Sequence, residues 1–274
     1  MNLPDIQGKL NQPGFFIYAA ADSTYFDLYG RSLVNSVLAN TTFGCHIHLY
    51  DPTPAQIDWC LARPRVSISW ETISAGQFDS AIEFWSRPDL DEPYQSRRKK
   101  MLGLKQLETQ TLAIWIKKTY YACMRFVRLS ELVSQPMRYL AIDIDGIVRA
   151  PFMIQFPDDD QQDIYLYEKT KRDKKTGQEI KTGHLAGSIL FTDKPQAMQF
   201  LHELADYVKN AITQDNIYWF LDQNAIDSVI VKYQRGLLPL SYIDWHMDAA
   251  SSIWTAKGRR KELEVFQREL KHYQ

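Results

Sequence analysis

The sequence predicts an α/β fold in which a mixed, mostly parallel sheet is flanked by helices. Apolar runs of strand length occupy residues 15–20, 46–50 and 66–70. Between the first two runs, apolar side chains recur at spacings of three and four from Phe26 to Val37, which is typical of a helix packed on one side. Strands that alternate with helices along a chain tend to pair in parallel within one sheet.

The rest of the chain continues this alternation. A polar loop at residues 21–24 leads into the first helix, which is expected to run through Asn40. Residues 86–100 are polar and basic and carry two prolines, which predicts a loop. Further strands are expected at residues 139–145 and 185–191, and further helices at residues 106–133, 196–210 and 218–231.

The chain is predicted to form a single domain. Its 274 residues suffice for one large α/β domain, 45% of them are hydrophobic, and no internal repeat or linker interrupts them. Leu263, Phe266 and Leu270 follow helical spacing near the end of the chain. We therefore expect one domain over residues 1–274, with a C-terminal helical extension at about residues 258–274.

Net charge and cysteine usage indicate which kinds of partner and which cellular compartment to expect. The net charge of −1 provides no basic field for nucleic acid, so no nucleic-acid partner is expected. Cys45, Cys60 and Cys123 are widely spaced and form no CxxC pattern, which suits a reducing compartment. The N-terminal residues show no signal sequence, and no apolar run has the length of a transmembrane segment. The expected localisation is cytoplasmic.

Two aspartates follow an apolar strand and form the strongest functional signal. Asp143 and Asp145 are two residues apart, so on a strand both carboxylates would face the same side. Ligands bind at the carboxyl ends of strands in open α/β sheets. Two close carboxylates repel each other unless a cation neutralises them, and a hard divalent ion suits oxygen ligands. The pair therefore predicts a metal site, although an Asp-x-Asp triplet alone is most often a solvated turn.

Residues 139–148 read Tyr-Leu-Ala-Ile-Asp-Ile-Asp-Gly-Ile-Val, which resembles the DxD segment of glycosyltransferases with the GT-A fold, especially family 8 and its relatives. In that family the two aspartates bind Mn²⁺ on a nucleoside diphosphate sugar. The resemblance extends over about residues 15–261 through short motifs that occur in the family's order. It implies that Asp143 and Asp145 are ligands of Mn²⁺ or Mg²⁺.

The first loop, residues 18–25, is similar to the family's nucleoside-binding segment AADxxY. The resemblance implies that Asp22 binds the base and that Tyr25 stacks on it, while Thr24 stands where some members have Asn. It also implies a nucleotide-binding set that includes the residues beside these and the residue between the aspartates: Ala20, Ala21 and Ile144.

Two further motifs imply residues close to the transferred sugar. Residues 121–125 resemble the helix whose arginine approaches the donor sugar, which implies a catalytic role for Arg125. Residues 220–224 resemble the Asp-Gln motif near the sugar and acceptor, which implies catalytic roles for Asp222 and Gln223. An ordinary helix cap at Asp222 and Gln223 is the structural alternative.

Residues 255–261 are similar to the family's closing His-x-x-Gly-x-x-Lys element. Gly258 and Lys261 match it, and Arg259 adds a cation, so this segment is expected to bind phosphate; a solvated helix flank is the alternative. Thr255 replaces the metal-binding His, which implies at best a weak third metal ligand. A second departure is Leu185, which stands where the family carries Asn in a position tied to sugar recognition.

Taken together, the resemblance implies a metal-dependent glycosyltransferase of the hexosyltransferase type. It would move a sugar from a nucleoside diphosphate sugar, most often a UDP-sugar in family 8, to a glycan, lipid or protein acceptor, with retention of anomeric configuration. One alternative is a haloacid-dehalogenase-type phosphatase, because residues 143–147 are close to its first motif. Another is a GT-A-like module that binds a nucleotide-sugar without turnover, which Thr255 and Leu185 would favour.

Three other features favour structural roles. His46 and His48 alternate on a strand and are expected to be core or surface residues rather than metal ligands. Trp245 and Trp254 suit stacking on sugars, but core packing is the safer expectation. Residues 168–183 are rich in lysine and predict a solvated hairpin tip, with a flap over a phosphate site as the alternative.

Overall fold

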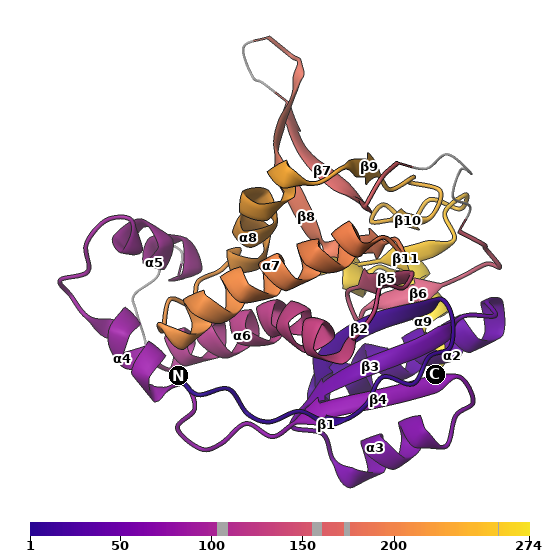
Figure 1. Ribbon diagram of the computed structural model, residues 1–274, viewed down its shortest axis with the longest axis horizontal. Coiled ribbons are helices and arrows are strands. Elements are labelled where there is room, and N and C mark those ends of the chain that lie inside the picture. Colours follow the sequence, from indigo (N-terminus) through magenta and orange to yellow (C-terminus); the bar gives the residue numbers. More distant parts are fainter. Residues whose placement is uncertain (103–108, 155–160, 173–175, 257) are drawn as a thin grey trace.

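The computed structural model describes residues 1–102, 109–154, 161–172, 176–256 and 258–274 (Figure 1). Its described part contains an eight-stranded sheet with the strand order β1-β4-β3-β2-β5-β8-β7-β9. The strands of this sheet are β1 (Gln7–Gly8), β2 (Phe16–Asp22), β3 (Gly44–Tyr50), β4 (Val66–Glu71), β5 (Tyr139–Ile142), β7 (Ile164–Arg172), β8 (Glu179–Phe191) and β9 (Arg235–Leu237).

Strands β4, β3, β2 and β5 run parallel and form the centre of the sheet. Because parallel strands end at a common edge, Asp22 at the end of β2 and the turn after Ile142 at the end of β5 both lie at the carboxyl edge. That edge is where open α/β sheets bind ligands. The predicted mixed, mostly parallel sheet is therefore confirmed.

The helices cover both faces of this sheet. They are α1 (Ser23–Tyr25), α2 (Arg31–Asn40), α3 (Pro54–Leu61), α4 (Asp79–Ser86), α5 (Tyr94–Leu102), α6 (Thr109–Leu132), α7 (Pro195–Thr213), α8 (Leu221–Val229) and α9 (Glu264–His272), with a π-helical turn at Phe26–Gly30 and 3₁₀ turns at Ile230–Lys232 and Gly258–Glu262. Helices α6 and α7 lie side by side across one face (Figure 1).

Successive side chains of β2 pack on opposite faces of the sheet, and both faces are buried. Phe16 and Tyr18 belong to the core cluster under α6 and α7, whereas Ile17 and Ala19 belong to the cluster under α2. Successive strand side chains point to opposite faces, so a strand covered on both sides needs a continuous apolar run. The run at residues 15–20 meets that need.

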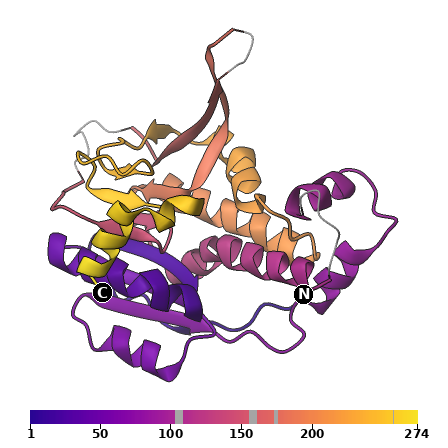
Figure 2. The same cartoon turned by 180° about the vertical axis from the view of Figure 1, so that it is seen from behind.

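A second, three-stranded sheet lies beside the first and has the order β10-β11-β6. Its strands are β6 (Gly146–Val148), β10 (Ile243–Asp244) and β11 (Ile253–Thr255). Helix α9 then packs on α2 (Figure 2). In this contact Ser32 Oγ donates a hydrogen bond to the carbonyl of Leu270 at 3.0 Å. The end of the chain is thereby held against the parallel half of the molecule.

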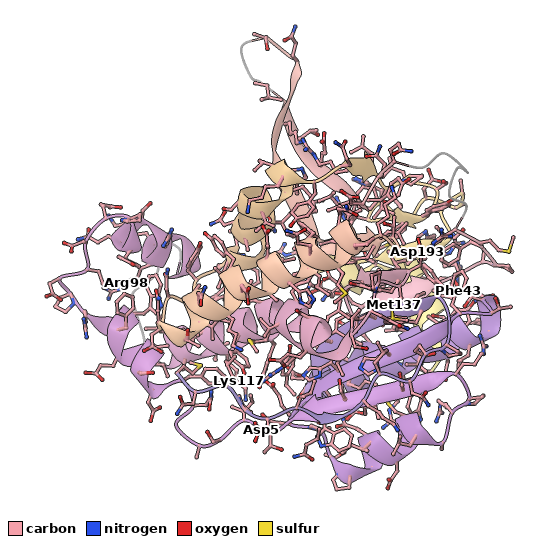
Figure 3. The ribbon with its side chains drawn as sticks, in the orientation of Figure 1. Asp5, Phe43, Arg98, Lys117, Met137 and Asp193 are labelled. Atoms are coloured by element: carbon pink, nitrogen blue, oxygen red, sulfur yellow. The ribbon has the colours of Figure 1, made fainter. Side chains whose placement is uncertain are left out.

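The loop predicted at residues 86–100 is wrong in its second half, because α5 begins at Tyr94. The prolines at positions 88 and 93 both precede the helix and do not interrupt it, and lysine and arginine are good helix formers. Helices α4 and α5 form an outlying lobe, on which Arg98 lies (Figure 3).

The expected strand at residues 139–145 is too long, since β5 ends at Ile142 and a turn follows. The histidine prediction is confirmed: His46 and His48 are buried on β3 and contact the hydroxyls of Ser67 and Ser69. Burial lowers the pKa of His46 to about 3, which keeps its ring neutral.

Strands β7 and β8 pair as the predicted hairpin, which projects from the body of the molecule (Figure 1). Residues 173–175 of the predicted tip lie outside the described residues.

Trp254 is buried, with the guanidinium of Arg149 3.7 Å from its ring centroid, and Trp245 packs against Tyr167 with ring centroids 4.5 Å apart. Packing thus accounts for both tryptophans. Among the described residues, no helix is long and apolar enough to cross a membrane.

A buried ion pair connects the longest helix to the sheet. Arg128 of α6 pairs with Glu71 at the end of β4, and their side chains are 2% and 0% exposed. Tyr120 donates a second hydrogen bond to Glu71 at 2.9 Å. A charge buried without its partner is strongly destabilising, so this contact holds α6 against the carboxyl edge.

We predict that Arg128→Ala lowers the free energy of unfolding by about 3–5 kcal/mol, because Glu71 loses its counter-charge in the interior. Arg138→Ala is the matched control, since Arg138 pairs with Asp193 at an exposed site and its loss should cost less than about 1 kcal/mol. Urea unfolding monitored by circular dichroism measures both. Equal destabilisation by the two variants would contradict the prediction.

Candidate functional site

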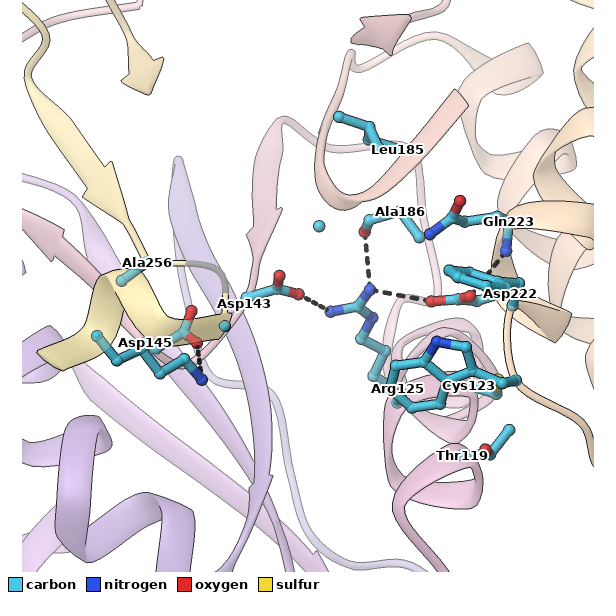
Figure 4. Close-up of a pocket in the computed structure, with 16 residues that line it drawn as sticks. Thr119, Cys123, Arg125, Asp143, Asp145, Leu185, Ala186, Asp222, Gln223 and Ala256 are labelled. Atoms are coloured by element: carbon cyan, nitrogen blue, oxygen red, sulfur yellow. Dashed lines mark hydrogen bonds and ion pairs between the residues drawn. The ribbon is translucent and has the colours of Figure 1, made fainter. Parts of the chain in front are cut away.

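The two aspartates lie in the turn between β5 and β6. The N–H of Gly146 donates to the carbonyl of Asp143 at 3.0 Å, which closes the turn and sends the chain into the second sheet. The pair is therefore not on one face of a strand, as alternation along a strand would require. In Figure 4 the side chains of Asp143 and Asp145 point toward different cationic partners.

Arg125 joins Asp143 to the rest of the site. Its guanidinium pairs with Asp143, donates to the carbonyl of Ala186 on β8 at 2.8 Å, and lies 3.5 Å from a carboxylate oxygen of Asp222 on α8 (Figure 4). Burial by itself lowers the pKa of Arg125, but the negative charges of Asp143 and Asp222 together raise this pKa by more. The net shift is therefore upward. Arg125 is therefore a permanent cation that connects three elements.

Asp145 has a different counter-charge. The ammonium of Lys261 lies 2.5 Å from its carboxylate and 4.8 Å from the ring centroid of Tyr25. Burial lowers the pKa of Lys261, whereas Asp145 raises it, and the net shift is upward. The first loop, the aspartate turn and the C-terminal segment thus meet at one ion pair, although more than 100 residues separate them along the chain.

Two adjoining cavities open at this edge. The first, here called the α8 cavity, has a volume of about 430 Å³ (Figure 4). Its lining comprises Thr119, Ala122, Cys123, Arg125, Asp143, Asp145, Leu185, Ala186, Gly187, Trp219, Phe220, Asp222, Gln223, Ala256, Gly258 and Lys261.

The second, here called the β2 cavity, has a volume of about 350 Å³. Its lining comprises Ala20, Ala21, Asp22, Tyr25, Trp115, Lys118, Tyr121, Ala122, Arg125, Asp143, Ile144, Asp145 and Trp219. The two cavities share five residues, including Arg125, Asp143 and Asp145. They are therefore two compartments of one groove, with the aspartate turn between them.

The predicted nucleotide residues divide between these compartments. Five of them line the β2 cavity, while Gly258 and Lys261 line the α8 cavity. Thr24 and Arg259 line neither cavity. Asp22 also caps α1, because its carboxylate accepts a hydrogen bond from the N–H of Tyr25 at 2.8 Å. This cap fixes the direction in which the first loop leaves β2.

The predicted catalytic residues line the α8 cavity. Asp222 and Gln223 lie in the first turn of α8, whose N-cap is Phe220 with a positive φ of 73° and no side-chain cap bond. The carboxylate of Asp222 accepts a hydrogen bond from the N–H of Gln223 at 2.8 Å and faces Arg125. A bulky residue with positive φ is strained, and such strain is frequent at functional sites.

The donor set suits a hard divalent cation in its chemistry. Asp143 and Asp145 supply carboxylate oxygens at a shared cavity rim, and each already holds a protein cation. Thr255 is buried on β11 opposite Gly146, and its hydroxyl has no hydrogen-bond partner among the residues that the structure describes. Thr255 lines neither cavity, and the described residues contain no cluster of three acidic, His or Cys ligands. The carboxylate pair is thus the part of the predicted metal site that lies in the groove.

Sequence reasoning missed four side chains that line this groove. Trp115, Lys118 and Thr119 lie on α6 and face the same groove as Arg125. Trp219 lines both cavities. The sequence did indicate that these α6 residues share a helix face, because positions 115, 118, 119 and 122 follow the helical spacing that also contains Arg125. That face of the helix could not be assigned to a groove without the tertiary structure.

Comparison with solved structures identifies the fold. No family model and no curated protein sequence matches this chain. Among solved structures, the chain is similar to the apo structure of the bifunctional glycosyltransferase WbbM, with a TM-score of 0.53 and 13% identity over 96% of this chain and 51% of that chain. It is also similar to the galactosyltransferase LgtC in complex with donor and acceptor sugar analogs, with a TM-score of 0.51 and 12% identity over 94% of this chain and 95% of that chain.

A third similar structure is the apo form of the glycosyltransferase GlyE of Streptococcus pneumoniae TIGR4, with a TM-score of 0.50 and 12% identity over 94% of this chain and 60% of that chain. The chain therefore spans about half the length of WbbM and most of LgtC. At these identities the likeness concerns the fold. The chain has the GT-A fold.

We predict that Arg125→Lys lowers the free energy of unfolding by about 1–3 kcal/mol, because an ammonium cannot span Asp143, Asp222 and the carbonyl of Ala186 together. Arg138→Lys, at an exposed ion pair, is the matched control and should change stability little. Urea unfolding at neutral pH compares the two. A variant as stable as the unmodified protein would show that the three contacts of Arg125 are not needed together.

Proposed function

We propose that this protein is a glycosyltransferase that takes a sugar from a nucleoside diphosphate donor, most suitably a UDP-sugar, with the help of Mn²⁺ or Mg²⁺. The observation that carries the proposal is the pair of adjoining cavities in a GT-A fold, with Asp143 and Asp145 on their common rim. In this proposal the nucleoside occupies the β2 cavity and the sugar occupies the α8 cavity. The diphosphate then lies at the aspartate turn.

The charges around the turn support this orientation. Breaking the bond between sugar and diphosphate leaves negative charge on the diphosphate, and cations aimed at that charge lower the barrier. Lys261 lines the α8 cavity beside Asp145 and remains protonated. A divalent ion held by Asp143 and Asp145 would supply further charge neutralisation when bound. Arg125 is occupied by two carboxylates, so its role is to orient Asp143 and Asp222.

Gln223 is proposed to act at the anomeric carbon, and Asp222 is proposed to hold sugar hydroxyls. Both line the α8 cavity from the first turn of α8 (Figure 4). A neutral amide whose carbonyl oxygen faces the reacting carbon steadies positive charge as the bond stretches without competing as a strong base. This arrangement is compatible with transfer that retains the anomeric configuration.

The phosphatase alternative is not favoured. It would use Asp143 as the nucleophile, but Asp143 is engaged by the buried guanidinium of Arg125. The similar structures are glycosyltransferases, which also argues against it. A module that binds donor without turnover differs from the proposed enzyme in kinetics, so release of UDP from a panel of UDP-sugars distinguishes them.

We predict that Asp145→Asn abolishes Mn²⁺-dependent binding of UDP while the fold persists, because the ion then keeps only one of its two carboxylate ligands. Isothermal titration calorimetry with UDP, with and without Mn²⁺, measures the loss. Asp193→Asn is the matched control at an exposed site away from the groove. Unchanged metal-dependent affinity in Asp145→Asn would remove the basis for a metal site here.

We predict that Gln223→Ala lowers kcat by about 10²-fold with little change in UDP affinity, since the lost interaction is made mainly in the transition state. Steady-state release of UDP from the best UDP-sugar gives kcat, and calorimetry gives the affinity. Asn224→Ala is the control on the same helix, because Asn224 lies outside both cavities and contacts the hydroxyl of Tyr218. Lower stability with unchanged activity per folded molecule would assign Gln223 a structural role.

A further inference from the structure

Helix α8 is held to strand β8 at two points. The first is indirect, because the guanidinium of Arg125 lies 3.5 Å from a carboxylate oxygen of Asp222 and donates to the carbonyl of Ala186 on β8 (Figure 4). The second lies further along the helix, where the carboxylate of Asp227 meets β8 at residues 183–184. Two separate attachments fix both the position of a helix on a strand and its rotation about its own axis.

The second attachment is a hydrogen-bonded pair of His184 and Asp227. One carboxylate oxygen of Asp227 accepts the backbone N–H of His184 at 3.0 Å and lies 2.6 Å from Nδ1 of its ring. A carboxylate can only accept, so we assign the proton to Nδ1. The other ring nitrogen, Nε2, is buried and has no hydrogen-bond partner among the residues that the structure describes. Asp227 therefore directs the ring, and a single oxygen atom binds both the side chain and the backbone of residue 184.

Gly183 leaves room for this contact. Its backbone has a φ of 141°, and a Cβ at this position would lie 2.6 Å from the second carboxylate oxygen of Asp227. Any side chain there would push the carboxylate away from the strand, whereas glycine tolerates both the backbone angle and the close approach. The strand is thus built to receive Asp227 at the residue directly before His184.

Helical spacing connects this attachment to the reaction centre. Asp227 follows Gln223 by four residues, so the two side chains share one face of α8 and lie about one turn apart. Gln223 lines the α8 cavity together with Leu185 and Ala186, the two residues that directly follow His184 on β8. The bond at Asp227 therefore sets where Gln223 lies relative to the strand that forms the opposite wall of the cavity.

We propose that His184 and Asp227 are a positioning pair that holds Gln223 in the direction it needs at the anomeric carbon. The inference rests on the proposed function, because it takes Gln223 as the residue that acts there. Neither His184 nor Asp227 lines the α8 or the β2 cavity, so the pair acts on the reaction only through α8. A catalytic group displaced by about 1 Å can lose about 10²-fold in rate. Loss of the pair should therefore lower kcat and leave the affinity for UDP unchanged.

The test uses the whole protein with Mn²⁺ and measures kcat for UDP release from the best UDP-sugar, with calorimetry for UDP affinity. Asp227→Ala should lower kcat about ten-fold and change UDP affinity less than about two-fold. Asp227→Asn should retain most of kcat, because its amide oxygen still accepts both hydrogen bonds from residue 184. Glu203→Ala is the matched control and should leave kcat unchanged. Glu203 pairs with Lys232 directly after α8 at 2.7 Å, and its side chain is 29% exposed, against 38% for Asp227.

A double variant separates positioning from a general loss of structure. If Asp227 acts through Gln223, Asp227→Ala should cause no further loss of kcat in protein that already carries Gln223→Ala. Urea unfolding checks that each variant folds. If Asp227→Ala does not fold, His184→Leu takes its place and His184→Asn becomes the conservative variant, because asparagine keeps a donor nitrogen on Cγ.

The outcomes distinguish this inference from the proposed function. A lower kcat with unchanged UDP affinity, rescue by Asp227→Asn and no further loss on Gln223→Ala support the positioning pair. Additive losses, or an unchanged kcat in Asp227→Ala, overturn it, while intact UDP binding and turnover leave the proposed function standing. An unmodified protein that binds no UDP, or that turns over no UDP-sugar, overturns the proposed function and with it the role of the pair.

Discussion

The buried guanidinium of Arg125 is the contact on which the groove depends, because it holds four separate parts of the chain in one place. It extends from α6 to the turn after β5, to the backbone of β8 and to the first turn of α8. An arginine in the interior needs charge partners on several sides, and its planar donors fix their relative directions. Burial of this one cation therefore requires Asp143 and Asp222 to converge on the α8 cavity, which both of them line.

A second cation closes the other side of the same turn. Lys261 reaches Asp145 from a 3₁₀ turn that precedes α9, and Gln267 of α9 donates to the carbonyl of Lys261 at 2.6 Å. Since α9 packs against α2, the position of Lys261 depends on contacts made far from the groove. The two aspartates thus pair with separate cations, Asp143 with Arg125 of α6 and Asp145 with Lys261 of the C-terminal segment.

The sheet explains why these contacts converge at this edge. Strands β2 and β5 are paired in parallel, so the loop after Asp22 and the turn after Ile142 leave the sheet side by side. Helix α6 crosses the same edge and is held by the Arg128–Glu71 pair at the end of β4. The buried ion pair at β4 and the buried guanidinium of Arg125 lie one turn apart on α6, so the helix that lines the groove is also held to the sheet by a buried ion pair.

The sequence by itself determined the alternating strands and helices, the apolar run before Asp143 and Asp145, and the short motifs around Asp22, Asp222 and Lys261, because these depend on local spacing and residue type. It could not place the aspartates in a turn rather than on a strand, since β5 ends where its ladder with β8 ends, at the pair Ile142–Ser188. Nor could it separate Trp115 and Trp219 in the groove from Trp245 and Trp254 in packed positions. A tryptophan has the same local signature in both environments, and only the packing of α6 and α8 around the carboxyl edge decides which rings face open space.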